Sequence, residues 1–150
     1  MRMFLMATAL LALAAPTAGA QGLVTQKALS MEMAQAIVQG TVERCRADGF
    51  SVSVTVVDAS GLLKAFLRDE GNGPHTIDLS RRKAYTALTF ASRFPTSLAF
   101  AAARGSTLGS PMPNVEGTVG VGGGVPIKVG DVAIGAVGVS GAVGGDKDEV

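Results

Sequence analysis

The segment 51–68 limits the possible folds most, because it has the pattern of two strands joined by a tight turn. Val52, Val54 and Val56 alternate with small polar residues, and this period of two is typical of a β-strand. The four residues 58–61 (Asp-Ala-Ser-Gly) are suited to a turn, after which a second apolar run begins. The pattern predicts an antiparallel hairpin, so the fold contains a sheet and not helices alone.

Three helices are predicted around this hairpin. An amphipathic helix is expected over residues 28–48, with its apolar side formed by Met33, Ile37, Val38, Val42 and Cys45. A second helix is expected from a Thr76 cap to about Ala91, with Asp78 in its first turn. A third, short helix is expected to open at Pro95 and to end at Ala103.

The glycine-rich last third adds two more strands. Residues 125–129 and 132–139 are apolar and meet at Gly130-Asp131, a suitable tight turn. Residues 141–145 are expected to be a flexible exit and residues 146–150 a charged end. Hairpin-connected strands with helices between them predict an α+β fold with an antiparallel sheet.

The first twenty residues have the three parts of a secretory signal peptide. Arg2 precedes an apolar run over residues 4–14 that only Thr8 interrupts, and Ala18-Gly19-Ala20 fits the small-residue cleavage rule. The run is shorter than the ~20 residues that span a bilayer. We therefore expect cleavage after Ala20, a single domain over residues 21–150, no membrane span, and a secreted or periplasmic location of the bacterial kind.

Charge and cysteine content exclude some classes of protein. The formal net charge is +1 and tryptophan is absent, which argues against a nucleic-acid partner. Cys45 is the only cysteine, so no internal disulfide is possible. Its helical spacing with apolar neighbours favours a small buried side chain over a reactive thiol.

Three stretches stand in order along the chain after the signal segment. They are VVDASGLL (56–63) followed by Arg68-Asp69, TID (76–78) followed by KAYTA (83–87), and GGVPI (123–127) followed by GAVGVSG (135–141). Together they resemble the GlcG/HbpS family of haem-binding and haem-degrading-like domains, which is also related to the C-terminal domain of corrinoid adenosyltransferases. The similarity extends from about residue 29 to residue 149.

The resemblance implies a three-layer α/β/α sandwich with a mainly antiparallel central sheet, and a homo-oligomer. Members of the family usually continue past the acidic end into a final helix, and this sequence departs from that pattern at Val150, so we expect the packing surface of that helix to be missing. Haem is the cofactor that the resemblance implies.

His75 is the first candidate for a site, because it is the only histidine and imidazole is a common axial ligand of haem iron. The alternative is a solvated histidine at the edge of a loop. Tyr85 and Met112 are further candidates for the axial position, since a phenolate or a thioether can also bind haem iron. Lys83 and Arg68 are candidates for pairing with haem propionates, and the alternative is a charged surface that pairs with nearby carboxylates.

These observations favour a secreted haem-binding protein, in haem or iron handling, over a catalyst. No catalytic constellation is recognised, so no catalytic residue is assigned. Two alternatives stay open: a non-catalytic accessory protein that binds a corrinoid or a small organic acid, and an enzyme that degrades haem or acts on another small substrate.

Overall fold

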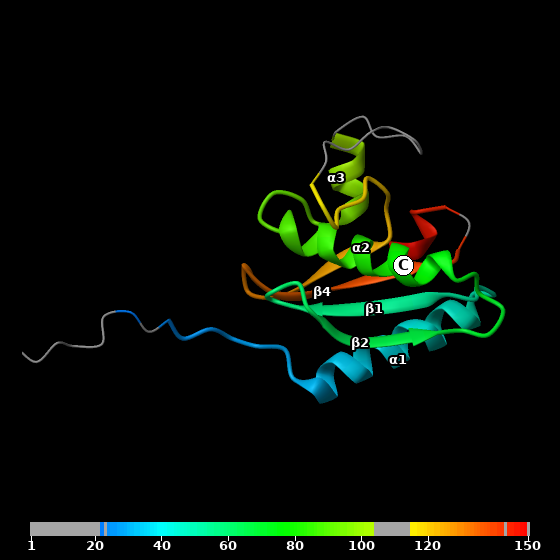
Figure 1. Cartoon of the computed structure of the whole chain (residues 1–150), viewed down its shortest axis with the longest axis horizontal. Helices are drawn as coiled ribbons and strands as arrows, with labels where there is room; N and C mark the ends of the chain where they lie inside the picture. Colours follow the sequence, from blue (N-terminus) through cyan, green and yellow to red (C-terminus); the bar gives the residue numbers. More distant parts are fainter. Residues whose placement is uncertain (1–21, 23, 104–114, 143, 150) are drawn as a thin grey trace, which may run out of the picture.

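The computed structural model describes residues 22, 24–103, 115–142 and 144–149, and its elements follow the predicted order (Figure 1). The helices are α1 (Met31–Ala47), α2 (His75–Thr89), α3 (Ser97–Ala103) and a 3-10 turn, η1 (Lys147–Glu149). The strands are β1 (Ser53–Asp58), β2 (Leu63–Arg68), β3 (Gly124–Val129) and β4 (Val132–Ser140). The proposed signal segment 1–20 and Met112 lie outside these ranges. Within the described ranges, no helix has the length and apolarity needed to cross a membrane.

The four strands form one sheet in the order β2-β1-β4-β3, and every neighbouring pair is antiparallel. Both predicted hairpins are present: Val54 pairs with Leu67 in the first, and Gly130 opens the turn of the second at φ +62°. The predicted α+β class with an antiparallel sheet is confirmed.

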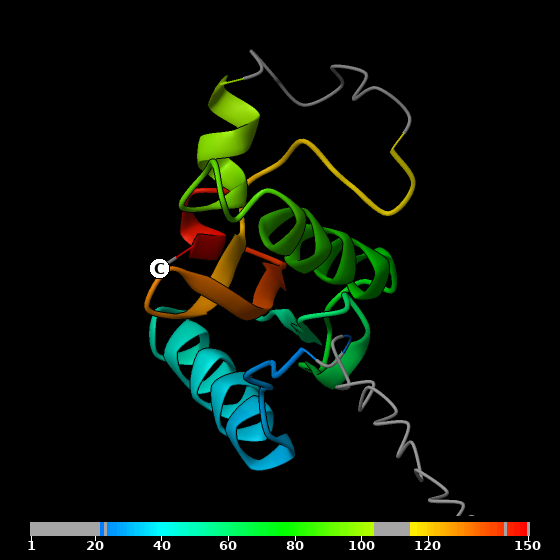
Figure 2. The same cartoon turned by 90° about the vertical axis from the view of Figure 1, so that its left-hand side faces the viewer.

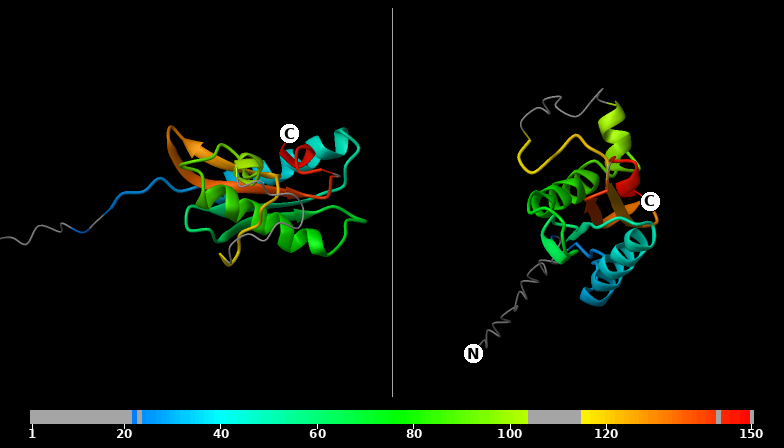
Figure 3. Two further views of the ribbon diagram at one scale, coloured as in Figure 1. Left: turned by 90° about the horizontal axis from the view of Figure 1, so that it is seen from above. Right: turned by 90° about the vertical axis from the view of Figure 1, so that its right-hand side faces the viewer.

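Helices cover both faces of the sheet: α1 lies on one face and α2 on the other (Figures 2 and 3). The alternation over residues 52–56, which begins one residue before β1, places successive side chains on opposite faces of the sheet. The valines 52, 54 and 56 join the apolar cluster with Val38, Val42 and Cys45 of α1. On the opposite face the hydroxyls of Ser53 and Thr55 lie 2.8 Å from those of Thr76 and Ser80 in α2. β1 is therefore buried on both sides, and its polar residues are satisfied by α2 and not by solvent.

The first helix is positioned by its cap and by one apolar stripe. The Ser30 hydroxyl accepts a hydrogen bond from the Met33 backbone N–H at 3.1 Å, a standard N-cap contact. The buried stripe is Ala34, Val38, Val42 and Cys45. The placement of Met33 on the apolar face was wrong, since its side chain is half exposed. Neighbouring helical positions differ by about 100°, so the stripe through Ala34 turns Met33 to the surface.

The start of α2 differs from the prediction. The N-cap residue is Pro74, and Thr76 lies inside the first turn, where it is buried. Its hydroxyl donates to the Gly73 carbonyl at 2.6 Å. Because proline has a fixed φ that suits a helix start, the helix begins earlier than a threonine cap would allow. Conversely, α3 begins at Ser97 and not at Pro95, because the Thr96 hydroxyl accepts from the Ala99 N–H at 3.2 Å and sets the start.

Two glycines let α2 lie very close to the sheet. A Cβ at Gly138 of β4 would meet the Ser80 carbonyl oxygen and would lie 2.5 Å from the Ala84 nitrogen. A Cβ at Gly124 of β3 would lie 2.8 Å from the Lys83 carbonyl carbon. Both glycines therefore allow the backbone of the middle of α2 to pack directly against the sheet.

A bidentate ion pair links the end of α1 to the end of β2. The Arg46 guanidinium donates from Nε to both carboxylate oxygens of Asp69, at 2.9 and 3.2 Å, and from Nη2 to Oδ1. The hydrogen bonds from Arg46 lower the pKa of Asp69 below its ordinary value.

We expect the stabilisation from Asp69 to depend on pH. Since the folded-state pKa is lowered, the stabilisation is present above the unfolded-state pKa and is lost as the pH falls through the folded-state pKa. The unfolding free energy of the wild type should exceed that of Asp69→Asn at neutral pH, and the gap should narrow as the pH falls below about 4. Urea unfolding of both proteins at a series of pH values measures this difference in unfolding free energy. A difference that does not change with pH would contradict the role of the ion pair.

Candidate functional site

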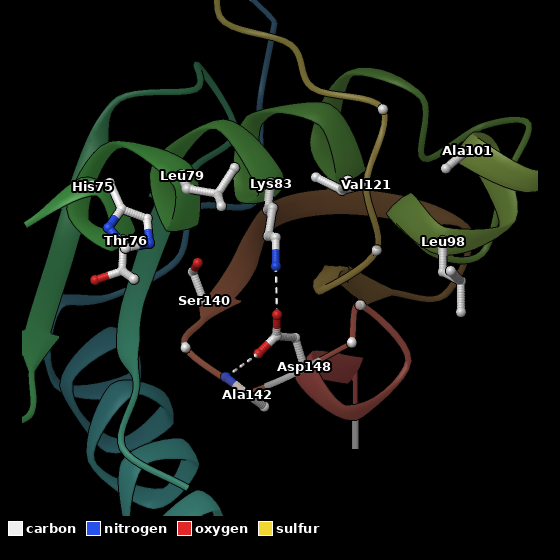
Figure 4. Close-up of a pocket in the computed structure, with 15 residues that line it drawn as sticks. His75, Thr76, Leu79, Lys83, Leu98, Ala101, Val121, Ser140, Ala142 and Asp148 are labelled. Carbon is white, nitrogen blue, oxygen red and sulfur yellow. Dashed lines mark hydrogen bonds and ion pairs between the residues drawn. The ribbon is translucent and has the colours of Figure 1, made fainter. Parts of the chain in front are cut away.

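A pocket of about 360 Å³ lies along one side of α2 (Figure 4). Its walls come from α2, from α3, from the glycine-rich stretch before β3, and from the chain after β4. The lining residues are His75, Thr76, Leu79, Lys83, Leu98, Ala101, Gly120, Val121, Gly122, Ser140, Gly141, Ala142, Gly144, Gly145 and Asp148. The volume lies within the range of small-molecule sites, and the wall combines apolar side chains with a few polar groups.

α2 supplies a single stripe of side chains to this pocket. His75, Leu79 and Lys83 are spaced by four residues, so they lie on the same side of the helix. His75 is exposed at the first position of the helix, whereas Lys83 is buried at its middle. The predicted iron ligand and the first predicted propionate partner therefore line one pocket, one at its edge and the other inside it.

Lys83 is paired with a carboxylate that the sequence did not reveal. Its ammonium lies 2.5 Å from Asp148 Oδ2, and both side chains are less than 5% exposed. Asp148 Oδ1 accepts a hydrogen bond from the Ala142 N–H at 3.1 Å (Figure 4). Burial raises the pKa of the Asp148 carboxyl, although the neighbouring Lys83 acts in the opposite direction.

The predicted charged end over residues 146–150 contributes to the pocket in its described part, although Asp146 and Lys147 are exposed. Asp148 is buried, and Glu149 Oε1 accepts hydrogen bonds from the backbone N–H groups of Leu98 (2.7 Å) and Gly123 (2.9 Å). These contacts place η1 against the base of α3, as Figures 2 and 3 show. Asp148 is buried because the buried ammonium of Lys83 requires a negatively charged partner within reach.

The other predicted site residues lie elsewhere. Arg68 is exposed at the end of β2 and donates to the Asn72 carbonyl at 2.6 Å. The Tyr85 ring lies between Gly61 and Gly117, where a Cβ would approach its atoms to 2.8 and 3.3 Å. Neither side chain lines the pocket of His75 and Lys83, and Met112 lies outside the described residues.

A second hollow of about 540 Å³ lies between α1 and β2. It is lined by Met31, Gln35, Ala36, Val38, Gln39, Lys64, Ala65, Phe66 and Leu67, and it contains no imidazole. In the part of the chain that the structure describes, no group of three or more His, Cys, Asp or Glu side chains is arranged to hold a metal ion. The α2 pocket is therefore the better candidate site, because it holds both the imidazole and the buried ammonium.

Comparison with family models decides the relationship. The model described as "Haem degrading protein HbpS-like" matches residues 29–150. The chain belongs to the HbpS-like family. No curated protein matches this HbpS-like chain.

Solved structures support the same assignment. The crystal structure of HbpS is 33% identical, with a TM-score of 0.74 over 85% of this chain and 87% of that one. A double mutant of HbpS from Streptomyces reticuli is 35% identical, with a TM-score of 0.75 over 91% and 90% of the two chains. The complex of PduOC with haem is 26% identical, with a TM-score of 0.67 over 81% and 88%.

Sequence reasoning missed the pocket's remaining walls for a physical reason. Val121 and Asp148 come from segments far from α2 in the sequence, and Leu98 comes from the next helix, so only tertiary packing brings them together. One signal was available in the sequence. His75, Leu79 and Lys83 are spaced by four residues, which places a lysine on a face of α2 where its neighbours are apolar or small.

Proposed function

We propose that this HbpS-like chain is a secreted haem-binding protein, and that haem lies in the α2 pocket with His75 as its axial ligand. The observation that carries the proposal is the pairing, in one pocket, of an imidazole at the edge and a buried ammonium inside. Imidazole binds haem iron, and an ammonium pairs with a propionate. The solved complex of PduOC with haem, which has the same fold, supports haem as the ligand.

The residues present fit a flat, partly apolar group. Leu79, Leu98 and Val121 provide apolar contacts, and five of the lining residues are glycines, so backbone is exposed along much of the wall. Bare backbone lets a planar ligand approach closely. Bound haem would supply a redox-active iron, His75 would bind that iron, and Lys83 would pair with a propionate.

Haemin titration of residues 21–150, followed by Soret absorbance, tests the proposal. We expect a saturable spectral change that ends at one haemin per chain, since the described residues present one such pocket. Bovine albumin serves as the positive control and haemin in buffer as the blank. A change that grows linearly with haemin and never saturates would refute haem binding.

A small organic acid is the second candidate ligand, because Lys83 and the Ala142 N–H already hold a carboxylate within the pocket. A thermal shift with succinate, measured beside haemin, separates the two candidates. Stabilisation by succinate and not by haemin would favour the organic acid.

Secretion, a role in iron handling and assembly into a homo-oligomer belong to the same proposal. The order of charge, apolar run and small residues over 1–20 supports secretion. Exposed Met31, Leu63 and Leu67 on α1 and β2 support self-association, since exposed apolar groups often mark interfaces. N-terminal sequencing of the exported protein should start at Gln21, and light scattering should give a mass above one chain.

A further inference from the structure

We propose that Lys83 anchors a carboxylate-binding subsite of the pocket, and that Asp148 occupies this subsite until a carboxylate of the ligand displaces it. We call residues 144–149, which carry Asp148, the C-terminal clasp. The inference rests on the proposed function, because it assigns the part of the pocket that receives the acidic group of the ligand.

The subsite is built to hold an anion. Lys83 is 3% exposed, and a buried ammonium is costly without a negative partner. The Ala142 N–H points to the same carboxylate as Lys83. Gly123 makes the room, since a Cβ there would lie 2.6 Å from Asp148 Cβ and 2.7 Å from the Lys83 ammonium. These groups would hold any carboxylate that replaced Asp148.

The clasp is attached mainly by polar contacts. Glu149 accepts hydrogen bonds from Leu98, Gly123 and the Ser97 hydroxyl, and the Lys147 ammonium lies 5.8 Å from the centre of the Phe50 ring. The clasp has the sequence Gly-Gly-Asp-Lys-Asp-Glu, so it buries no large apolar side chain. Segments with few buried apolar contacts open at a lower free energy than the core.

Exchange of one carboxylate for another preserves the balance of charge in the pocket. Lys83 keeps a negative partner throughout, and the Asp148 carboxylate moves from a buried site into water. Burial raises the pKa of Asp148, which means that the ionised form gains from that move. The subsite therefore selects ligands that bring their own carboxylate, whether a haem propionate or a free organic acid.

Hydrogen exchange of the full mature chain tests the displacement with three probes: haemin, haemin dimethyl ester and succinate. The ester presents the same macrocycle without free carboxylates. We expect haemin to accelerate exchange of the backbone amides in 144–149 and to bind at least about tenfold more tightly than the ester. The ester, if it binds, should leave the clasp protected.

Variants of the clasp provide a second measurement. Glu149→Gln removes the charge that accepts hydrogen bonds from the Leu98 and Gly123 N–H groups, and it leaves the Lys83–Asp148 pair in place. The clasp should then open more easily, so haemin affinity should rise several-fold. Asp148→Asn should raise it as well, provided that this variant folds. Asp131→Asn removes one negative charge at the β3–β4 turn, away from the pocket, and should change neither the exchange of the clasp nor the affinity.

The outcomes separate the inference from the proposed function. If haemin and its ester bind equally while the clasp stays protected, the inference fails and haem binding stands. If neither binds, haem binding fails and the succinate arm decides: accelerated exchange of 144–149 supports a subsite for free organic acids, and unchanged exchange overturns the inference.

Discussion

Replacing Gly138 by alanine should lower the free energy of unfolding by about 3 kcal/mol, at the upper end of what overpacking usually costs. Gly138 lies in β4 beneath α2, and an added Cβ would meet backbone atoms of Ser80 and Ala84. Backbone cannot rotate away as a flexible side chain can, so α2 must shift from the sheet. Such a shift would also disturb the hydroxyl pair between Thr55 and Ser80.

Gly40→Ala is the matched control. Gly40 lies in α1, and nothing stands within 4 Å of the position its Cβ would take. Alanine is favoured over glycine inside a helix by up to about 1 kcal/mol, so this variant should be as stable as the wild type or more stable. Urea unfolding of both variants measures the difference. Equal stability of the two variants would contradict the close seating of α2.

Phe100→Ala should cost about 3 kcal/mol of unfolding free energy, the low end of the range for a buried phenylalanine. Phe100 is 2% exposed; its ring stacks on Phe90 with centroids 4.1 Å apart and makes a T-shaped contact with Phe94, with centroids 5.4 Å apart. These rings fasten α3 to the chain after α2. Since Leu98 and Ala101 of α3 line the pocket, haemin affinity should fall together with stability.

Phe100→Leu keeps most of the apolar volume and should cost less than half as much as the alanine variant. Calorimetric unfolding gives the stabilities, and haemin titration of each variant gives the affinities. Full haemin affinity in a folded Phe100→Ala protein would show that α3 is not needed as a wall of the pocket.

Local patterns predicted most of the fold because the local signals agree with each other. The valine alternation marks a strand, the turns at 58–61 and at Gly130-Asp131 each specify one antiparallel connection, and the structure contains both hairpins. Boundaries moved where a neighbouring residue fixed the start of a helix, as Pro74 and Thr96 did.

The site was less predictable, because its chemistry depends on burial. His75 and Lys83 could be named from residue type and family resemblance, and they line one pocket. That Lys83 is buried and paired with Asp148 follows from the close approach of β3, β4 and η1 to α2, which no short window of sequence contains. The same packing keeps Tyr85 on a different side of α2, between Gly61 and Gly117.

The most direct test of the account is haemin titration of two variants beside the wild type, followed by Soret absorbance. His75→Ala removes the imidazole at the edge of the α2 pocket, and Ala36→Trp fills the hollow between α1 and β2. We predict that His75→Ala shifts the Soret band and weakens binding at least about tenfold, while Ala36→Trp binds like the wild type. An unchanged band in His75→Ala together with lost binding in Ala36→Trp would place haem in the other hollow and contradict the account.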